Sequence, residues 1–148
     1  MNINTLDHIV LTTAHLEECL HFYVDILGMK LLEKDGRYAL GFGNQKINIH
    51  RRKGEFLPAA AHITCGSLDF CLITTDDIES VKKELLENGI VPEEGIVKRT
   101  GALGPIDSIY LRDPDGNLVE IAAYQSSLDI SLPAAPMPDQ SIGPHGLP

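Results

Sequence analysis

Apolar and polar residues alternate in several short segments that are separated by turns. Residues 7–12, DHIVLT, alternate with a period of two, which predicts a half-buried strand. Apolar residues then recur at spacings of three and four from Leu16 to Leu27, which predicts a helix that ends at Gly28. Asp35-Gly36 and Gly43-Asn44 are turn signals, and they separate three further predicted strands, MKLLEK, RYALGF and QKINIH.

The same order of signals returns in the second half of the chain. LDFCLITT at 68–75 is similar to LDHIVLTT at 6–13, and a second helical stripe runs from Ile78 to Leu85. Two extended segments follow, and a Asp-Pro-Asp-Gly turn leads into the strand NLVEIAAY, residues 117–124. Each half therefore predicts the order β-α-β-β-β, which indicates an internal duplication of the α+β class.

The predicted domain covers residues 1–125, with a first module at about 5–52 and a second at about 67–125. Residues 126–148 contain five of the nine prolines and no periodic apolar pattern. Such a composition is typical of a flexible tail.

Composition narrows the class of partner. Hydrophobic residues make up 43% of the chain and charged residues 22%, values typical of a globular protein. The net charge of -9 argues against binding to nucleic acid or to an anionic membrane surface. The chain has no apolar stretch of membrane-spanning length and no secretory signal pattern, and its three cysteines form no CxxC motif. We therefore expect a cytoplasmic protein with reduced thiols.

Strand alternation gathers polar residues on one face of the predicted sheets. In the first strand His8 shares its face with Val10 and Thr12, opposite Asp7, Ile9 and Leu11. Asn48 and His50 share one face of their strand, and Glu120 lies opposite Val119 and Ile121. If the helices cover the Ile and Val faces, these polar residues line one concave surface. A buried carboxylate such as Glu120 needs a cation or hydrogen bonds, and histidine with carboxylate is a usual ligand set for divalent metals.

Simpler interpretations of the same residues remain open. Glu120 could pair with Arg37 or Arg112, and His8 could be a hydrogen-bonded structural histidine. His62, in the segment PAAAHITCG, could line a pocket.

Three motifs give the chain a family resemblance: LDHIVLTT, HFYVDILGM and YLRDPDGNLVEI. With them the chain resembles the vicinal oxygen chelate superfamily, which includes glyoxalase I, bleomycin-resistance proteins and extradiol dioxygenases. The resemblance runs from Leu6 to about Tyr124. It implies two βαβββ modules that form a curved mixed-sheet cup around a divalent ion such as Zn, Ni, Mn or Fe.

The resemblance also implies a ligand set, because the first and fourth strands of each module supply ligands in this family. His8 and Glu120 match two of these positions. Asp69 stands where the second module normally has histidine, and Asn48 or His50 stands where glyoxalase I has glutamate. The predicted metal ligands are therefore His8, His50, Asp69 and Glu120, with Glu120 also the predicted catalytic base.

The position of Asp69 depends on how the two octamers are aligned. Matching them letter by letter sets Asp69 against Asp7, and Asp69 then points away from the cup. The family pattern sets Asp69 against His8, with one extra residue before the second helix.

Two functions are compatible with these features. The first is a glyoxalase-like, metal-dependent lyase, isomerase or transferase that chelates vicinal oxygens of a small metabolite and stabilises an enediolate or oxyanion. In that case the resemblance implies a homodimer, with His8 and His50 from one subunit and Asp69 and Glu120 from the other. The alternative is a non-catalytic protein that sequesters a small molecule, as bleomycin-resistance members do.

Overall fold

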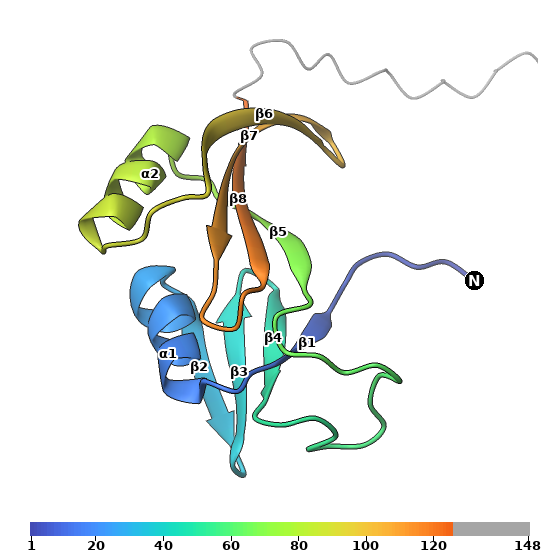
Figure 1. Ribbon diagram of the computed structural model, residues 1–148. Helices are drawn as coiled ribbons and strands as arrows, with labels where there is room; N and C mark the ends of the chain where they lie inside the picture. Colours follow the sequence, from blue (N-terminus) through green and yellow to red (C-terminus); the bar gives the residue numbers. More distant parts are fainter. Residues whose placement is uncertain (126–148) are drawn as a thin grey trace, which may run out of the picture.

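The computed structural model describes residues 1–125, so the predicted tail of 126–148 lies outside the described residues. Both halves of the chain have the predicted element order (Figure 1). The first half contains β1 (His8–Thr12), α1 (Leu16–Leu20), η1 (His21–Ile26), β2 (Lys30–Lys34), β3 (Arg37–Phe42) and β4 (Gln45–His50). The second half contains β5 (Asp69–Ile73), α2 (Ile78–Glu87), β6 (Glu94–Gly101), β7 (Gly104–Arg112) and β8 (Leu118–Tyr124).

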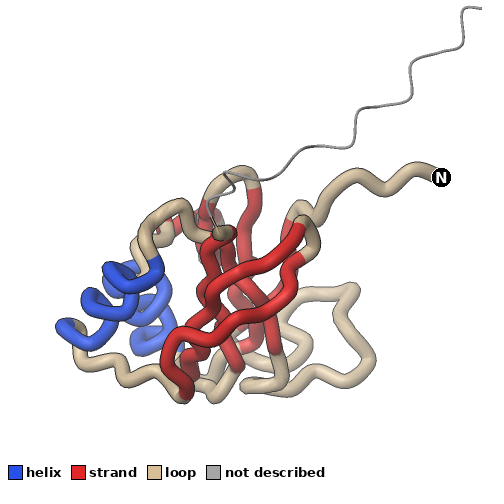
Figure 2. The backbone as a smooth tube through the Cα atoms, turned by 90° about the horizontal axis from the view of Figure 1, so that it is seen from above, coloured by secondary structure: helices blue, strands red, loops and turns tan. Residues whose placement is uncertain are grey.

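Each half forms a four-stranded mixed sheet, and the strand order is the same in both. Sheet A has the order β1-β4-β3-β2, and sheet B has the order β5-β8-β7-β6. In each sheet the first strand runs parallel to the last, while the other neighbours are antiparallel. The helices gather on one side of the two sheets (Figures 1 and 2). The predicted α+β fold with two equivalent modules is confirmed.

The first helix differs from the regular helix that the apolar spacing predicts. Beyond α1 the backbone widens into η1, a π-helical segment in which the Leu27 N–H donates to the carbonyl of Phe22 at 3.0 Å. Both Phe22 and Tyr23 are buried there. The segment ends at Ile26, and Gly28 just beyond its C-cap residue Leu27 has a φ of 72° and closes the helix as expected.

One hydrophobic core serves both modules. It lies between the helices and the sheets and joins Leu11 and Phe22 of the first half to Ile78 and Val119 of the second. Because the apolar residues of the two halves pack in one cluster, neither module buries its apolar face alone.

A buried carboxylate fixes the turn between β7 and β8. Oδ1 of Asp113 accepts hydrogen bonds from the N–H groups of Asn117 at 2.8 Å and Asp115 at 3.0 Å. Oδ2 accepts from the Asn117 side-chain amide at 2.7 Å and from the hydroxyl of Tyr23 at 2.8 Å. Since Tyr23 belongs to η1, this carboxylate connects the two modules.

Three further contacts attach the same turn to distant parts of the chain. The Ala14 N–H donates to Asp115 Oδ1 at 2.9 Å, and the Leu68 N–H donates to Asn117 Oδ1 at 2.8 Å. Gly66 has a φ of 73°, and a β-carbon there would collide with the carbonyl oxygen of Asp115. Only glycine therefore fits at this position.

The negative charge of Asp113 acts on two buried neighbours. Burial, together with the neighbouring Asp113 charge, raises the pKa of the Cys19 thiol to about 12. The pKa of the Tyr23 hydroxyl is raised by the same two causes. Both groups stay protonated, so Tyr23 remains a hydrogen-bond donor.

None of the helices in the described range 1–125 is long and apolar enough to cross a membrane.

Replacing Tyr23 by Phe tests the connection between the modules. We expect the free energy of unfolding in urea to fall by about 1.5–3 kcal/mol, because a buried carboxylate loses a hydrogen bond. Tyr124→Phe is the matched control, since the Tyr124 hydroxyl only accepts from the exposed Leu103 N–H. Its expected effect is within about 0.5 kcal/mol. Equal losses in the two variants would contradict the special role of Tyr23.

Candidate functional site

Every predicted ligand lies on the face of its sheet that the helices leave free, called here the open face. Alternate residues of the inner strands pack into the core, including Ile47 and Ile49 of β4 and Val119 and Ile121 of β8. The residues between them face the opposite way. The open face of sheet A presents His8, Val10, Thr12, Lys46, Asn48 and His50. The open face of sheet B presents Asp69, Cys71, Ile73, Leu118, Glu120 and Ala122.

The structure decides the alignment of Asp69. Phe70 and Leu72 pack against the core, and the pairing of β5 with β8 sets Asp69 beside Leu118 and Cys71 beside Glu120. Asp69 therefore stands on the same face as Glu120. It is equivalent to His8 rather than to Asp7, and the link to the following helix is one residue longer than in the first module.

The internal repeat also distinguishes Asn48 from His50. Val10 pairs with Asn48 in sheet A as Cys71 pairs with Glu120 in sheet B, so Asn48 is the equivalent of Glu120. His50 stands level with Thr12, two residues farther along β4. Both side chains are on the open face, but only Asn48 occupies the position that corresponds to Glu120 of the second module.

Glu120 has an uncompensated oxygen. Its Oε1 is buried and has no hydrogen-bond partner among residues 1–125. The expected alternative partner Arg112 instead pairs with Glu93, at 2.8 Å. A buried carboxylate oxygen without a partner costs several kcal/mol, which a cation would offset. Burial and the neighbouring Glu120 raise the pKa of the Cys71 thiol to about 11.

His8 has a partner that sequence reasoning missed. Its Nδ1 lies 2.6 Å from Asp7 Oδ1, and His8 in turn holds the pKa of Asp7 below its usual value. With Nδ1 occupied by the carboxylate, Nε2 is the nitrogen available to a metal. Strand alternation would place Asp7 on the other face. Asp7, however, precedes the first residue of β1, so that rule does not apply to it.

The predicted ligands do not form one cluster, and His8 and His50 stand four residues apart along the paired strands. His8 and His50 are on sheet A, whereas Asp69 and Glu120 are on sheet B. Within one chain, the described residues contain no group of three or more His, Cys, Asp or Glu side chains that could hold a metal. Histidine and carboxylate are donor types that suit a divalent ion.

A pocket of about 460 Å³ lies where the long loop after β4 covers part of sheet A. Val10, Thr12 and His50 line it from the strands. His62 lines it from the loop, as one of the sequence alternatives anticipated.

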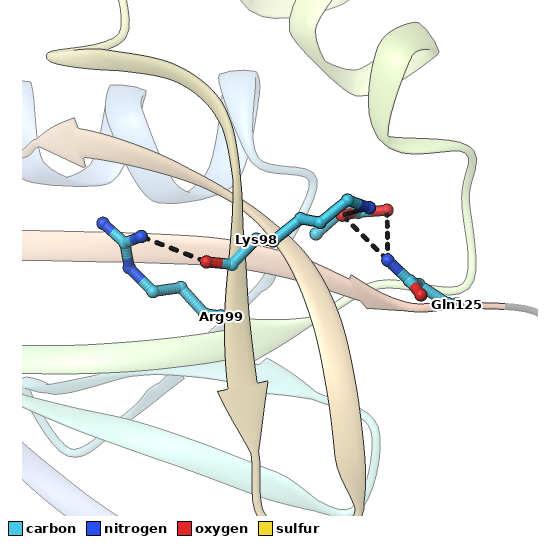
Figure 3. Close-up of polar contacts among 4 residues, drawn as sticks. Lys98, Arg99 and Gln125 are labelled. Atoms are coloured by element: carbon cyan, nitrogen blue, oxygen red, sulfur yellow. Dashed lines mark hydrogen bonds and ion pairs between the residues drawn. The ribbon is translucent and has the colours of Figure 1, made fainter.

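The cations on the outer strands of sheet B are bound by neighbouring groups (Figure 3). Lys98 pairs with Asp107 at 3.1 Å, and Gln125 donates to the same carboxylate. Arg99 donates to the carbonyl of Lys98 and pairs with Glu94 at 3.3 Å. These contacts hold Lys98 and Arg99 of the edge strand β6 in place and pair both of their charges with carboxylates.

Comparisons with known proteins give relatives over most of the chain. The virulence protein STM3117 of Salmonella typhimurium is 49% identical over 125 residues, covering 84% of this chain and 87% of that protein. Its crystal structure matches with a TM-score of 0.82 at 48% identity, covering 84% of this chain and 100% of that chain. An integron cassette protein from V. cholerae matches with a TM-score of 0.81 at 47% identity, over 84% and 98% of the two chains.

A fungal relative carries a family name. The glyoxalase domain-containing protein RDO1 of Mycosarcoma maydis is 46% identical over 128 residues, covering 86% of this chain and 72% of that protein. In addition, residues 5–121 match the family profile. The chain therefore belongs to the glyoxalase/bleomycin resistance protein/dioxygenase superfamily.

Proposed function

We propose that two copies of this chain pair through their open faces and form divalent metal sites, and that the protein is a glyoxalase-like enzyme acting on a small metabolite. The observation that carries the proposal is the buried Glu120 Oε1, which has no partner in the described part of its own chain. A group that is costly to bury and lies on an open sheet face is explained by a cation.

The proposed ligands come from both chains. His8 of one chain, oriented by Asp7, supplies a nitrogen, and Asp69 and Glu120 of the second chain supply carboxylate oxygens. His50, the fourth ligand that the sequence predicts, stands four residues along β4 from the row of His8, about 13 Å away, which is too far to share an ion with His8. The internal repeat instead places Asn48 at the position equivalent to Glu120, and we propose Asn48 as the fourth donor. Two carboxylates with neutral donors neutralise a divalent charge.

Glu120 has the features of a general base in this arrangement. A divalent ion held at the site supplies a Lewis acid for two adjacent oxygens of a substrate. Glu120 is half-buried beside Cys71 and Tyr110, so its carboxylate is shielded from part of the solvent. It takes a proton from the carbon next to the substrate oxygens and returns it to the product.

Sequestration without catalysis is the second candidate. The pocket of about 460 Å³ beside His50 and His62 offers a small molecule a binding place that needs no metal ligand. The two candidate functions differ in metal binding, which the enzyme requires and sequestration does not.

Metal loading tests the proposed site. After treatment with a chelator, addition of Zn²⁺, Ni²⁺, Mn²⁺ or Fe²⁺ should bind one ion per chain and raise the thermal midpoint, because the ion binds the folded state. His8→Ala and Glu120→Gln should lose both effects, and Asp7→Asn should weaken affinity by about 10–100-fold. Metal analysis and thermal unfolding measure these outcomes.

Glu79→Gln is the control, since Glu79 is exposed on α2. It should bind metal as the unchanged protein does. A protein that binds none of the four ions, with an unchanged midpoint, would rule out the metalloenzyme and leave sequestration.

Mixing two defective variants tests whether the sites are shared. A dimer of one His8→Ala chain and one Glu120→Gln chain has one site with both changes and one intact site. Joint refolding should therefore restore metal binding to roughly a quarter of the unchanged level, since half of the dimers are mixed. Differently tagged chains verify that mixed dimers form. Mixed dimers that bind no metal would show that each site belongs to one chain.

A further inference from the structure

The open face of sheet A carries a concentration of positive charge. Arg37 stands level with His50 of β4, because the next residue, Tyr38, pairs with Ile49. Lys34 of β2 pairs with Arg37 from the other side. A pocket of about 700 Å³ lies over this face. We call it the basic pocket, and it is lined by Lys34, Arg37, Lys46, Asn48, His50 and Phe56 among others. Such a cluster is unexpected in a chain with a net charge of -9.

Arg37 has a fixed position but no acceptor. Its guanidinium carbon lies 4.1 Å from the centre of the Phe56 ring, and the Phe56 ring meets His50 edge-on at 5.2 Å. Among residues 1–125, Arg37 has neither a carboxylate within 4.0 Å nor a hydrogen-bond acceptor. A guanidinium stacked on a ring keeps its N–H groups free at the edge, where they match a planar or tetrahedral oxyanion.

Three other arginines differ from Arg37 in this respect. Arg51 pairs with Glu55, Arg112 with Glu93, and Arg99 with Glu94. Arg99 also donates to the Lys98 carbonyl (Figure 3). The pairing of these arginines is complete within the chain, whereas the donors of Arg37 are directed at a cavity. Among residues 1–125, Arg52, exposed in the loop after β4, also lacks an ion pair, but it does not line the basic pocket.

Two carboxylates also belong to the lining of the basic pocket, but among residues 1–125 they form no ion pairs with its cations. Glu33 and Asp35 line the pocket at the turn between β2 and β3. Neither forms an ion pair within 4.0 Å with Lys34, Arg37 or Lys46 in the described part of the chain. Glu33 of β2 lies beside Tyr38 of β3 in the strand register, on the sheet face opposite to Arg37. Its side chain therefore starts from the other face of the sheet.

We infer that the basic pocket binds an oxyanion group, a carboxylate or a phosphate, with Arg37 as its principal donor and Lys34, Lys46 and His50 as supporting charges. The inference rests on the proposed function in one respect, because it takes the bound oxyanion group to be one end of the substrate of the proposed enzyme. Asn48 belongs both to this pocket and to the row equivalent to Glu120. The substrate class is then a small organic anion.

Strand geometry bounds the length of that substrate. Residues that lie side by side on neighbouring strands form a row across the sheet. Successive rows on the same face are two residues apart along a strand, which is about 7 Å. The His8 row and the His50 row are four residues apart along β4, which is about 13 Å. The metabolite would have its anionic end near Arg37 and its reacting oxygens near His8 and Asn48. Its length and the length of the side chains that reach toward it together cover this distance.

Anion titration of the metal-free protein tests the pocket without any turnover. Inorganic phosphate and acetate are titrated separately into ¹⁵N-labelled protein treated with chelator, against chloride at equal ionic strength. We expect saturable shifts at the Arg37 side-chain N–H and at the amides of His50 and Phe56. In Arg37→Gln the affinity should fall about tenfold or more, as expected for a lost charge-assisted pair. The stronger of the two anions identifies whether the carboxylate or the phosphate is preferred.

Arg99→Gln is the matched control, because Arg99 stands on sheet B and already has partners. It should leave anion affinity unchanged. Equal weakening in both variants, or shifts spread over all cations, would reduce the effect to general electrostatics and overturn the site. A change from dimer to monomer in Arg37→Gln by light scattering would also overturn it, since Arg37 would then pair with a second chain.

The two proposals can fail separately. If metal stabilises the protein while neither anion binds at Arg37, only the basic pocket is wrong. If both anions bind while no ion stabilises the protein, the pocket is a sequestration site and the metalloenzyme is wrong.

Discussion

The buried carboxylate of Asp113 is the interaction on which the arrangement of the two modules depends. It accepts four hydrogen bonds, and one of its donors, Tyr23, belongs to the other module. A carboxylate taken out of water is tolerated only when its oxygens are satisfied in this way. Because its donors are fixed on both sides of the boundary between the modules, the relative position of the two open faces follows from this one turn.

The open faces contrast with that turn. Within the described chain the Asp113 network is satisfied, whereas Glu120 Oε1 and the guanidinium of Arg37 have no polar partner. Both lie on sheet faces that the helices do not cover. Folding of a single chain thus satisfies the Asp113 carboxylate at the boundary and leaves groups of opposite charge without partners on the two open faces. This division is typical of sites whose partners are not part of the chain.

Most strands and the equivalence of the modules could be predicted from the sequence, because alternation and turn residues are local signals. The open-face position of Glu120 followed from the same rule. The π-helical segment η1 could not be predicted, since its apolar spacing also fits an α-helix. The alignment of Asp69 and the distinction between Asn48 and His50 depend on strand pairing, which is a long-range property. Asp7 was missed because it lies just before a strand, where alternation no longer determines direction.

The loop between β4 and β5 is fastened at both ends but not in the middle. At its start Arg51 is paired with Glu55, and at its end Gly66 and Leu68 are held against the turn of Asp115 and Asn117. The intervening residues, which include His62, line a pocket and contribute little to the core. Substitutions in this middle part therefore alter what the protein accommodates at small cost in stability. The fold can thus diversify its ligands by changing one segment while its two sheets stay as they are.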